Sequence, residues 1–131
     1  MIYLDTSVVL AHLLAEDRSP PPSLWDETLV SSRLLEYEVW TRVHALGLAK
    51  THAEVVQAAL DRVSFLELSR TVLARALEPF PIRVRTLDAL HLAAAHFLNE
   101  RGQRLEILTY DDRMAAAARR MSLPLSRFCG E

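Results

Sequence analysis

Short apolar runs alternate along the chain with longer segments in which apolar residues recur every three or four positions. The short runs predict strands at 2–4, 29–32, 65–68 and 105–110, with a further edge strand at 123–128. The periodic segments predict helices at 8–14, 34–46, 51–63, 71–78, 86–99 and 111–121, and a short one at 24–27. Strands separated by helices of this length predict an α/β domain around a parallel sheet.

Residues with capping or stopping character mark the ends of these helices. Hydroxyl side chains are expected to begin four of them: Thr6 or Ser7, Ser23, Thr51 and Thr86. Gly47 and Gly102 are expected to end two of them, because glycine adopts the left-handed backbone of a helix end without strain. No internal repeat, low-complexity tract or linker interrupts this order.

Length and composition fit one domain that covers residues 1–131. A chain of 131 residues, half of them hydrophobic, can bury a core without disulfides, and Cys129 is its only cysteine. No apolar run approaches the ~20 residues of a membrane span. The first residues carry Asp5 and no basic leader, which argues against a signal peptide. We therefore expect a cytoplasmic protein with no membrane association.

Two aspartates follow predicted strands directly. Asp5 comes after the first strand, and Asp111 comes after the strand that ends at Tyr110. In open parallel sheets, ligands bind beyond the carboxyl ends of the strands, so both side chains are candidates for a binding site. Both also open helices, where the N-terminal amides favour negative charge, and a purely structural role fits each of them alone.

Asp88 lies in a helix that has scarcely any other polar residue in its first three turns. A carboxylate in so apolar a setting is costly to desolvate unless a partner compensates its charge, and a cation is the simplest partner. The alternative is a carboxylate of the first helical turn, with Thr86 as the cap. His91 follows three residues later on the same face, within hydrogen-bonding reach of Asp88, although a satisfied core histidine is the simpler interpretation.

Two glutamates compete for a place in the same candidate site. Glu36 and Glu38 both fall inside the broad apolar band of the helix at 34–46, so helix geometry does not choose between them. Carboxylates that converge raise one another's pKa or require a counter-ion. Oxygen ligands without a cysteine or histidine cluster favour hard cations such as Mg²⁺ or Mn²⁺, which can position water for attack on a phosphodiester.

The net charge of −2 argues by itself against a nucleic-acid binder. Setting four of the 17 acidic residues aside as cation-bound leaves 13 against 15 basic residues, a balance of +2. Lys50 is the only lysine, and arginine is well suited to bidentate phosphate contacts, although a GC-rich genome would also enrich it. With four carboxylates occupied by cations, the charge no longer argues against nucleic-acid binding.

Four segments resemble, in order, the motifs of the PIN-domain family, and most closely those of its VapC toxins. They are IYLDTS at 2–7, SSRLLEYEV at 31–39, LDALHLA at 87–93 and TYDDRM at 109–114. In the second motif the serine six residues ahead of the acid matches Ser32, which places the family's glutamate on Glu38. Each motif alone is weak, but the ordered set spans nearly the whole chain.

This resemblance implies a three-layer α/β/α sandwich with a central parallel sheet and an endoribonuclease that uses Mg²⁺ or Mn²⁺. The implied metal-binding and catalytic residues are Asp5, Glu38, Asp88 and Asp111. The implied supporting or RNA-contacting residues are Ser7, Thr109, Asp112 and Arg113, with the division of roles between Asp111 and Asp112 left open. Family toxins form homodimers and are silenced by a VapB-type antitoxin, so both partners are expected besides the RNA substrate.

Three other functions compete with the toxin. One is a housekeeping PIN-domain nuclease that processes RNA without an antitoxin, and another is a catalytically inactive PIN fold that acts as a binding module. A phosphohydrolase with Asp5 as nucleophile is the third. That chemistry requires an aspartate where Ser7 stands and a lysine beside the phosphate, whereas Lys50 lies between two predicted helices.

Overall fold

A four-stranded parallel sheet forms the centre of the protein in the computed structural model, which describes residues 1–130. Its strands are β1 (Ile2–Leu4), β2 (Leu29–Ser32), β3 (Val63–Leu66) and β4 (Glu106–Leu108), in the order β3-β2-β1-β4. In register, Tyr3 of β1 lies beside Val30 of β2 on one side and Ile107 of β4 on the other. The first strand therefore lies inside the sheet, with neighbours on both sides.

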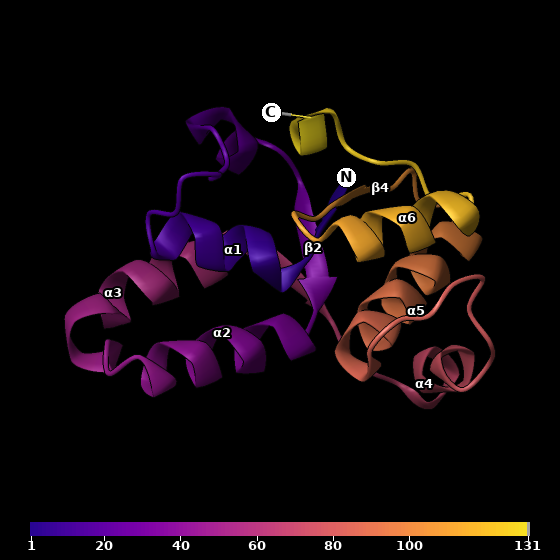
Figure 1. The fold of residues 1–131 in the computed structure, drawn as a ribbon, viewed down its shortest axis with the longest axis horizontal. Helices are drawn as coiled ribbons and strands as arrows, with labels where there is room; N and C mark the ends of the chain where they lie inside the picture. Colours follow the sequence, from indigo (N-terminus) through magenta and orange to yellow (C-terminus); the bar gives the residue numbers. More distant parts are fainter. Residues whose placement is uncertain (131) are drawn as a thin grey trace.

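Six α-helices in the described residues cover the two faces of this sheet. They are α1 (Thr6–Leu13), α2 (Leu34–Ala45), α3 (Ala49–Leu60), α4 (Arg70–Ala76), α5 (Thr86–Glu100) and α6 (Asp112–Arg120), with 3₁₀ turns at Pro22–Asp26 and Arg127–Gly130. Figure 1 shows α1, α2 and α3 on one side of the sheet and α4, α5 and α6 on the other. The predicted three-layer α/β/α sandwich is confirmed.

Alternate residues of the central strands supply two separate hydrophobic cores. Ile2 and Leu4 pack with the apolar residues of α1, α2 and α3, whereas Tyr3 between them packs with those of α4, α5 and α6. This alternation follows from the two-residue period of a strand. Because both faces are covered, all three β1 residues are buried and the run is continuously apolar, as parallel sheets require.

Most predicted elements form, with shifted boundaries. The third strand lies at Val63–Leu66 rather than 65–68, and α3 begins at Ala49, two residues before Thr51. Gly47 and Gly102 follow α2 and α5 with φ of +69° and +81°, which confirms them as helix-ending residues.

The predicted edge strand at 123–128 is wrong. Ile107 and Leu125 form one isolated bridge, supported by hydrogen bonds of 2.8 Å from the Ile107 amide to the Pro124 carbonyl and from the Ser126 amide to the Ile107 carbonyl. The chain then turns, because the Ser126 hydroxyl accepts a hydrogen bond from the Phe128 amide and starts a 3₁₀ turn that buries the Phe128 ring. The apolar pattern here reflects burial in a turn.

The parallel arrangement brings the ends of β1, β2 and β4 to one edge of the sheet. The segments that follow these strands begin at Asp5, Arg33 and Thr109. None of the helices in residues 1–130 is long and apolar enough to cross a membrane.

Replacing Leu4 with alanine is expected to lower the free energy of unfolding by about 2–5 kcal/mol, because this fully buried side chain would leave a cavity in the core. Leu77→Ala is the matched control, since the Leu77 side chain is 89% exposed and its loss should cost less than about 0.5 kcal/mol. Urea unfolding followed by circular dichroism measures both. Equal destabilisation by the two variants would contradict the assigned core.

Candidate functional site

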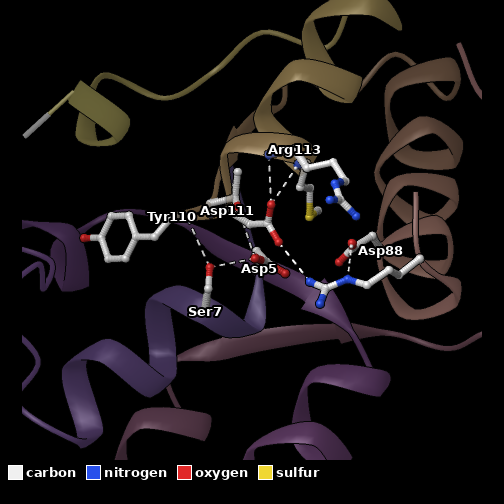
Figure 2. Close-up of polar contacts among 9 residues, drawn as sticks. Asp5, Ser7, Asp88, Tyr110, Asp111 and Arg113 are labelled. Atoms are coloured by element: carbon white, nitrogen blue, oxygen red, sulfur yellow. Dashed lines mark hydrogen bonds and ion pairs between the residues drawn. The ribbon is translucent and has the colours of Figure 1, made fainter. Parts of the chain in front are cut away.

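Acidic side chains from four segments of the chain gather at the carboxyl edge of the sheet. Asp5 follows β1, Asp111 follows β4, Asp88 lies in the first turn of α5, and Glu38 lies in the second turn of α2. Figure 2 shows Asp5, Asp88 and Asp111 pointing toward a common space. Residues that are far apart in the sequence thus contribute to one site.

Two hydroxyl groups orient the Asp5 carboxylate. Its Oδ2 atom accepts hydrogen bonds from the Ser7 hydroxyl at 2.6 Å and from the Thr109 hydroxyl at 2.8 Å. Each hydroxyl oxygen in turn accepts a backbone N–H, Ser7 from Tyr110 at 3.1 Å and Thr109 from Asp111 at 3.0 Å. Neutral donors therefore hold Asp5 in place without supplying a compensating positive charge.

The predicted capping role of Thr6 or Ser7 is wrong, because both hydroxyls are used elsewhere. The N-cap residue of α1 is Asp5, and no side chain caps this helix. The Ser7 hydroxyl binds Asp5, and the Thr6 hydroxyl donates to Glu38 Oε1 at 2.8 Å. The start of α1 thus supplies two hydroxyls to the acidic site.

Arg85 bridges two of the aspartates. Its Nε donates to Asp88 Oδ2 at 3.3 Å, and its Nη2 donates to Asp111 Oδ2 at 3.0 Å. The other carboxylate oxygen of Asp111 accepts the backbone N–H groups of Arg113 and Met114 at 2.9 and 3.2 Å and so caps α6. Asp111 therefore has a structural role as well as a place in the site.

The charge of the site is only partly compensated. Burial raises the pKa of the Asp88 carboxyl above its usual range, and the neighbouring Asp111 and Asp5 raise it further, while Arg85 acts in the opposite direction. The burial and the two negative charges together outweigh the single guanidinium. An additional positive charge among these three aspartates would stabilise their ionised forms.

Glu38 belongs to a second, more deeply buried network. Its Oε1 atom lies 2.6 Å from His91 Nε2, and His91 Nδ1 lies 2.8 Å from the Tyr3 hydroxyl, which accepts the Ser32 N–H at 3.1 Å. Tyr3 and His91 are fully buried, and Thr6 Oγ1 is also within 3.2 Å of His91 Nε2. This chain of contacts links the sheet to α5 and α2.

The tautomer of His91 follows from these contacts. Burial raises the pKa of the Tyr3 phenol, so its O–H keeps its proton and donates to His91 Nδ1. His91 Nε2 then carries the ring proton and donates to Glu38. The hydrogen bond between His91 and Asp88 considered from their spacing is wrong, because the ring reaches α2 and β1 instead.

The structure separates the two glutamates that helix periodicity left open. Glu36 lies 3.6 Å from Arg33 Nη1 in a half-exposed pair, whereas Glu38 contacts the hydroxyl of Thr6, the residue next to Asp5. Glu38 is therefore the glutamate on the side of the aspartates. Asp112 and the Arg113 side chain, by contrast, are exposed in the first turn of α6.

Sequence reasoning missed the roles of Arg85, Thr6 and Tyr3, and it left His91 as a core histidine. Arg85 stands three residues before Asp88, a spacing that places the two side chains together at the start of a helix. Tyr3 gave a weaker signal, as the one residue with a hydroxyl in an apolar strand. Their partners lie on other elements, so local patterns did not reveal them.

The donor chemistry of the site suits a hard divalent cation, because carboxylate oxygens and hydroxyls converge here. As the side chains stand, however, no group of three or more acidic, histidine or cysteine residues within 1–130 is placed to hold a metal ion. Arg85 lies between Asp88 and Asp111, and Glu38 is bonded to His91. Arg85 therefore occupies carboxylate oxygens that a cation would also use.

A groove of about 1060 Å³ opens beside the acidic site. Ser7 and Tyr110 from the site form part of its wall, and three of its lining residues are arginines: Arg18, Arg42 and Arg85. The Arg18 guanidinium lies 4.4 Å from the centre of the Tyr110 ring, a cation–π distance. Glu16 and Asp17 also line the groove, which thus combines three arginines, two acidic residues and an aromatic side chain next to the site.

Comparison with known proteins matches nearly the whole chain. The family model described as PIN domain covers residues 2–120. Two similar proteins come from Mycobacterium tuberculosis: Ribonuclease VapC46, 34% identical over 93% of both chains, and Ribonuclease VapC35, 32% identical over 94% of this chain and 93% of the relative. Ribonuclease VapC47 from the same species is 29% identical over 91% of this chain and 90% of its own length. The predicted resemblance to the PIN-domain family is confirmed, and the chain belongs to that family.

Proposed function

We propose that this protein is a Mg²⁺- or Mn²⁺-dependent endoribonuclease and the toxin of a VapBC-type toxin–antitoxin pair. The observation that carries the proposal is the convergence of Asp5, Asp88 and Asp111 at one edge of the sheet, with Glu38 held beside them through Thr6 and with three arginines in the lining of the adjacent groove. The similarity to proteins named Ribonuclease VapC supports the same activity.

The four acids would hold the metal, and the surrounding residues would orient them. When bound, the ion would supply Lewis-acid stabilisation of charge at the scissile phosphate and activate a water molecule. Ser7 and Thr109 would keep the Asp5 carboxylate in one orientation, and His91 would do the same for Glu38. The groove arginines would bind the RNA backbone, and the exposed Arg113 lies on the neighbouring helix start for a further phosphate contact.

The biological setting is part of the same proposal. We propose a single PIN-like domain over residues 1–131 that acts in the cytoplasm as a homodimer and is neutralised by a VapB-type antitoxin. The extent of the match to the VapC relatives supports this, since each alignment covers at least 90% of both chains. The housekeeping RNA-processing nuclease remains the alternative with the same site.

The wild-type protein is expected to cut a fluorogenic RNA when Mg²⁺ or Mn²⁺ is present and to stop when EDTA is added. Asp5→Asn should reduce the rate at least ~100-fold, because the amide keeps an oxygen for Ser7 and Thr109 but loses the charge that a cation requires. The exposed Asp26→Asn is the control and should cut normally. An uncleaved RNA with folded wild-type protein would favour an inactive binding module.

Glu38→Gln and Glu36→Gln form a matched pair two residues apart on α2. The first is expected to reduce RNA cleavage by about 10- to 100-fold, because it removes the charge that His91 and Thr6 orient. The second removes only a half-exposed contact with Arg33 and should leave the rate within about twofold. Initial rates at saturating Mn²⁺ measure both. A larger loss in the Glu36 variant would reverse their assignment.

Expression of the wild-type chain in a bacterial host is expected to arrest growth, whereas Asp88→Asn should not. Co-expression of the short open reading frame next to the gene should restore growth if it encodes the antitoxin. Growth curves and total-RNA profiles record the result. RNA cleavage in vitro without any effect on growth would favour the housekeeping nuclease.

A further inference from the structure

We infer that Arg85 is a built-in competitor of the divalent cation: its guanidinium holds Asp88 and Asp111 together until a metal ion displaces it. The inference rests on the proposed metal-dependent function. It also accounts for the one disagreement between that function and the structure, namely that the acids converge but are not placed to hold an ion as they stand.

The geometry places Arg85 where a cation would act. Two different nitrogens of the guanidinium contact two different carboxylates, Nε at 3.3 Å from Asp88 Oδ2 and Nη2 at 3.0 Å from Asp111 Oδ2. In Figure 2 the Asp88 and Asp111 side chains point into the space between α5 and the start of α6, with Asp5 at its edge. A divalent ion bound to these oxygens would have to replace the guanidinium, because both need the same acceptors.

The contacts of the Arg85 guanidinium can also be replaced by a cation at low cost in free energy. The Arg85 side chain is 69% exposed, whereas that of Asp88 is 10% exposed. Arg85 is the N-cap residue of α5, with an extended backbone at φ −81° and ψ 163°. Its side chain can therefore leave the acids without disturbing the helix. The contact with the part-exposed Asp111 contributes little net stability, since solvent screens it and ordering a long side chain opposes it. A cation that replaced the guanidinium would compensate the buried Asp88 in its place.

The neutral His91 ring, which is the partner of Glu38, does not share this property. The His91 ring beside Glu38 is 1% exposed and is also held by the Tyr3 hydroxyl, so it stays in place when the solvent or ions change. Arg85 is the partner that lies at the surface, on the wall of the groove. Displacement by a cation would leave its guanidinium at the groove, next to the acids.

Competition between Arg85 and the cation predicts the direction in which a substitution changes the apparent affinity for the metal. If Arg85 occupies the acids for about 90% of the time, the apparent affinity for the metal falls about tenfold, because only the remaining fraction can bind. Removing the guanidinium should therefore tighten metal binding, whereas removing a residue that helps to assemble the site should weaken it.

The test is Mn²⁺ binding by isothermal titration calorimetry to the full chain of the wild type, Arg85→Gln and Arg83→Gln. Arg83 is an exposed arginine two residues earlier, and its substitution removes the same charge from the same segment. We expect Arg85→Gln to bind Mn²⁺ about tenfold more tightly and Arg83→Gln to stay within about twofold of the wild type. Arg85→Lys should lie between, since it keeps the charge but loses the two-pronged contact.

A second measurement follows Arg85 directly. In ¹⁵N-resolved spectra of the wild type, the Arg85 Nε–H signal is expected to shift when diamagnetic Mg²⁺ is added, with the same midpoint as metal binding. Equal or weaker Mn²⁺ binding by Arg85→Gln, or Mg²⁺ binding without a change in this signal, would overturn the competitor role and leave the nuclease proposal standing. If neither the wild type nor Arg85→Gln binds Mn²⁺, both proposals fail.

Discussion

The burial of carboxylates at one edge of a parallel sheet is the constraint on which the site depends. Parallel pairing aligns the strand ends, so the residues after β1 and β4 meet, and the first turn of α5 brings Asp88 beside them. Burial removes the Asp88 carboxylate from water, and this desolvation raises its pKa even though the exposed guanidinium of Arg85 acts in the opposite direction. The folded chain therefore maintains a region of negative potential that favours cations.

The groups around the acids are mostly neutral, and this has a physical consequence. Hydroxyls from Ser7, Thr109 and Thr6 and the imidazole of His91 orient the carboxylates through hydrogen bonds without neutralising them. Had these partners been lysines or arginines, the acids would form permanent ion pairs. The arrangement therefore favours a site whose negative charge is compensated by a bound cation. Arg85 compensates part of that charge at the surface when no cation is bound.

The elements and the acidic motifs could be predicted from the sequence because they depend on local patterns. Buried β1, the stops at Gly47 and Gly102, and the position of Asp111 at a strand end all follow from neighbouring residues. Contacts between the layers decide which of Glu36 and Glu38 faces the site and which groups His91 binds. The periodicity within one helix gives no information about such contacts. The prediction of an edge strand at 123–128 was wrong for a related reason. The Ser126 hydroxyl accepts a backbone N–H and turns the chain away from the sheet.

The contacts of His91 also tie the two hydrophobic cores to each other. Tyr3 belongs to the core beneath α4, α5 and α6, whereas Glu38 extends from α2 on the opposite side of the sheet. One imidazole joins them through polar bonds of 2.8 and 2.6 Å. The imidazole therefore fixes the position of the Glu38 carboxylate relative to both helical layers at once.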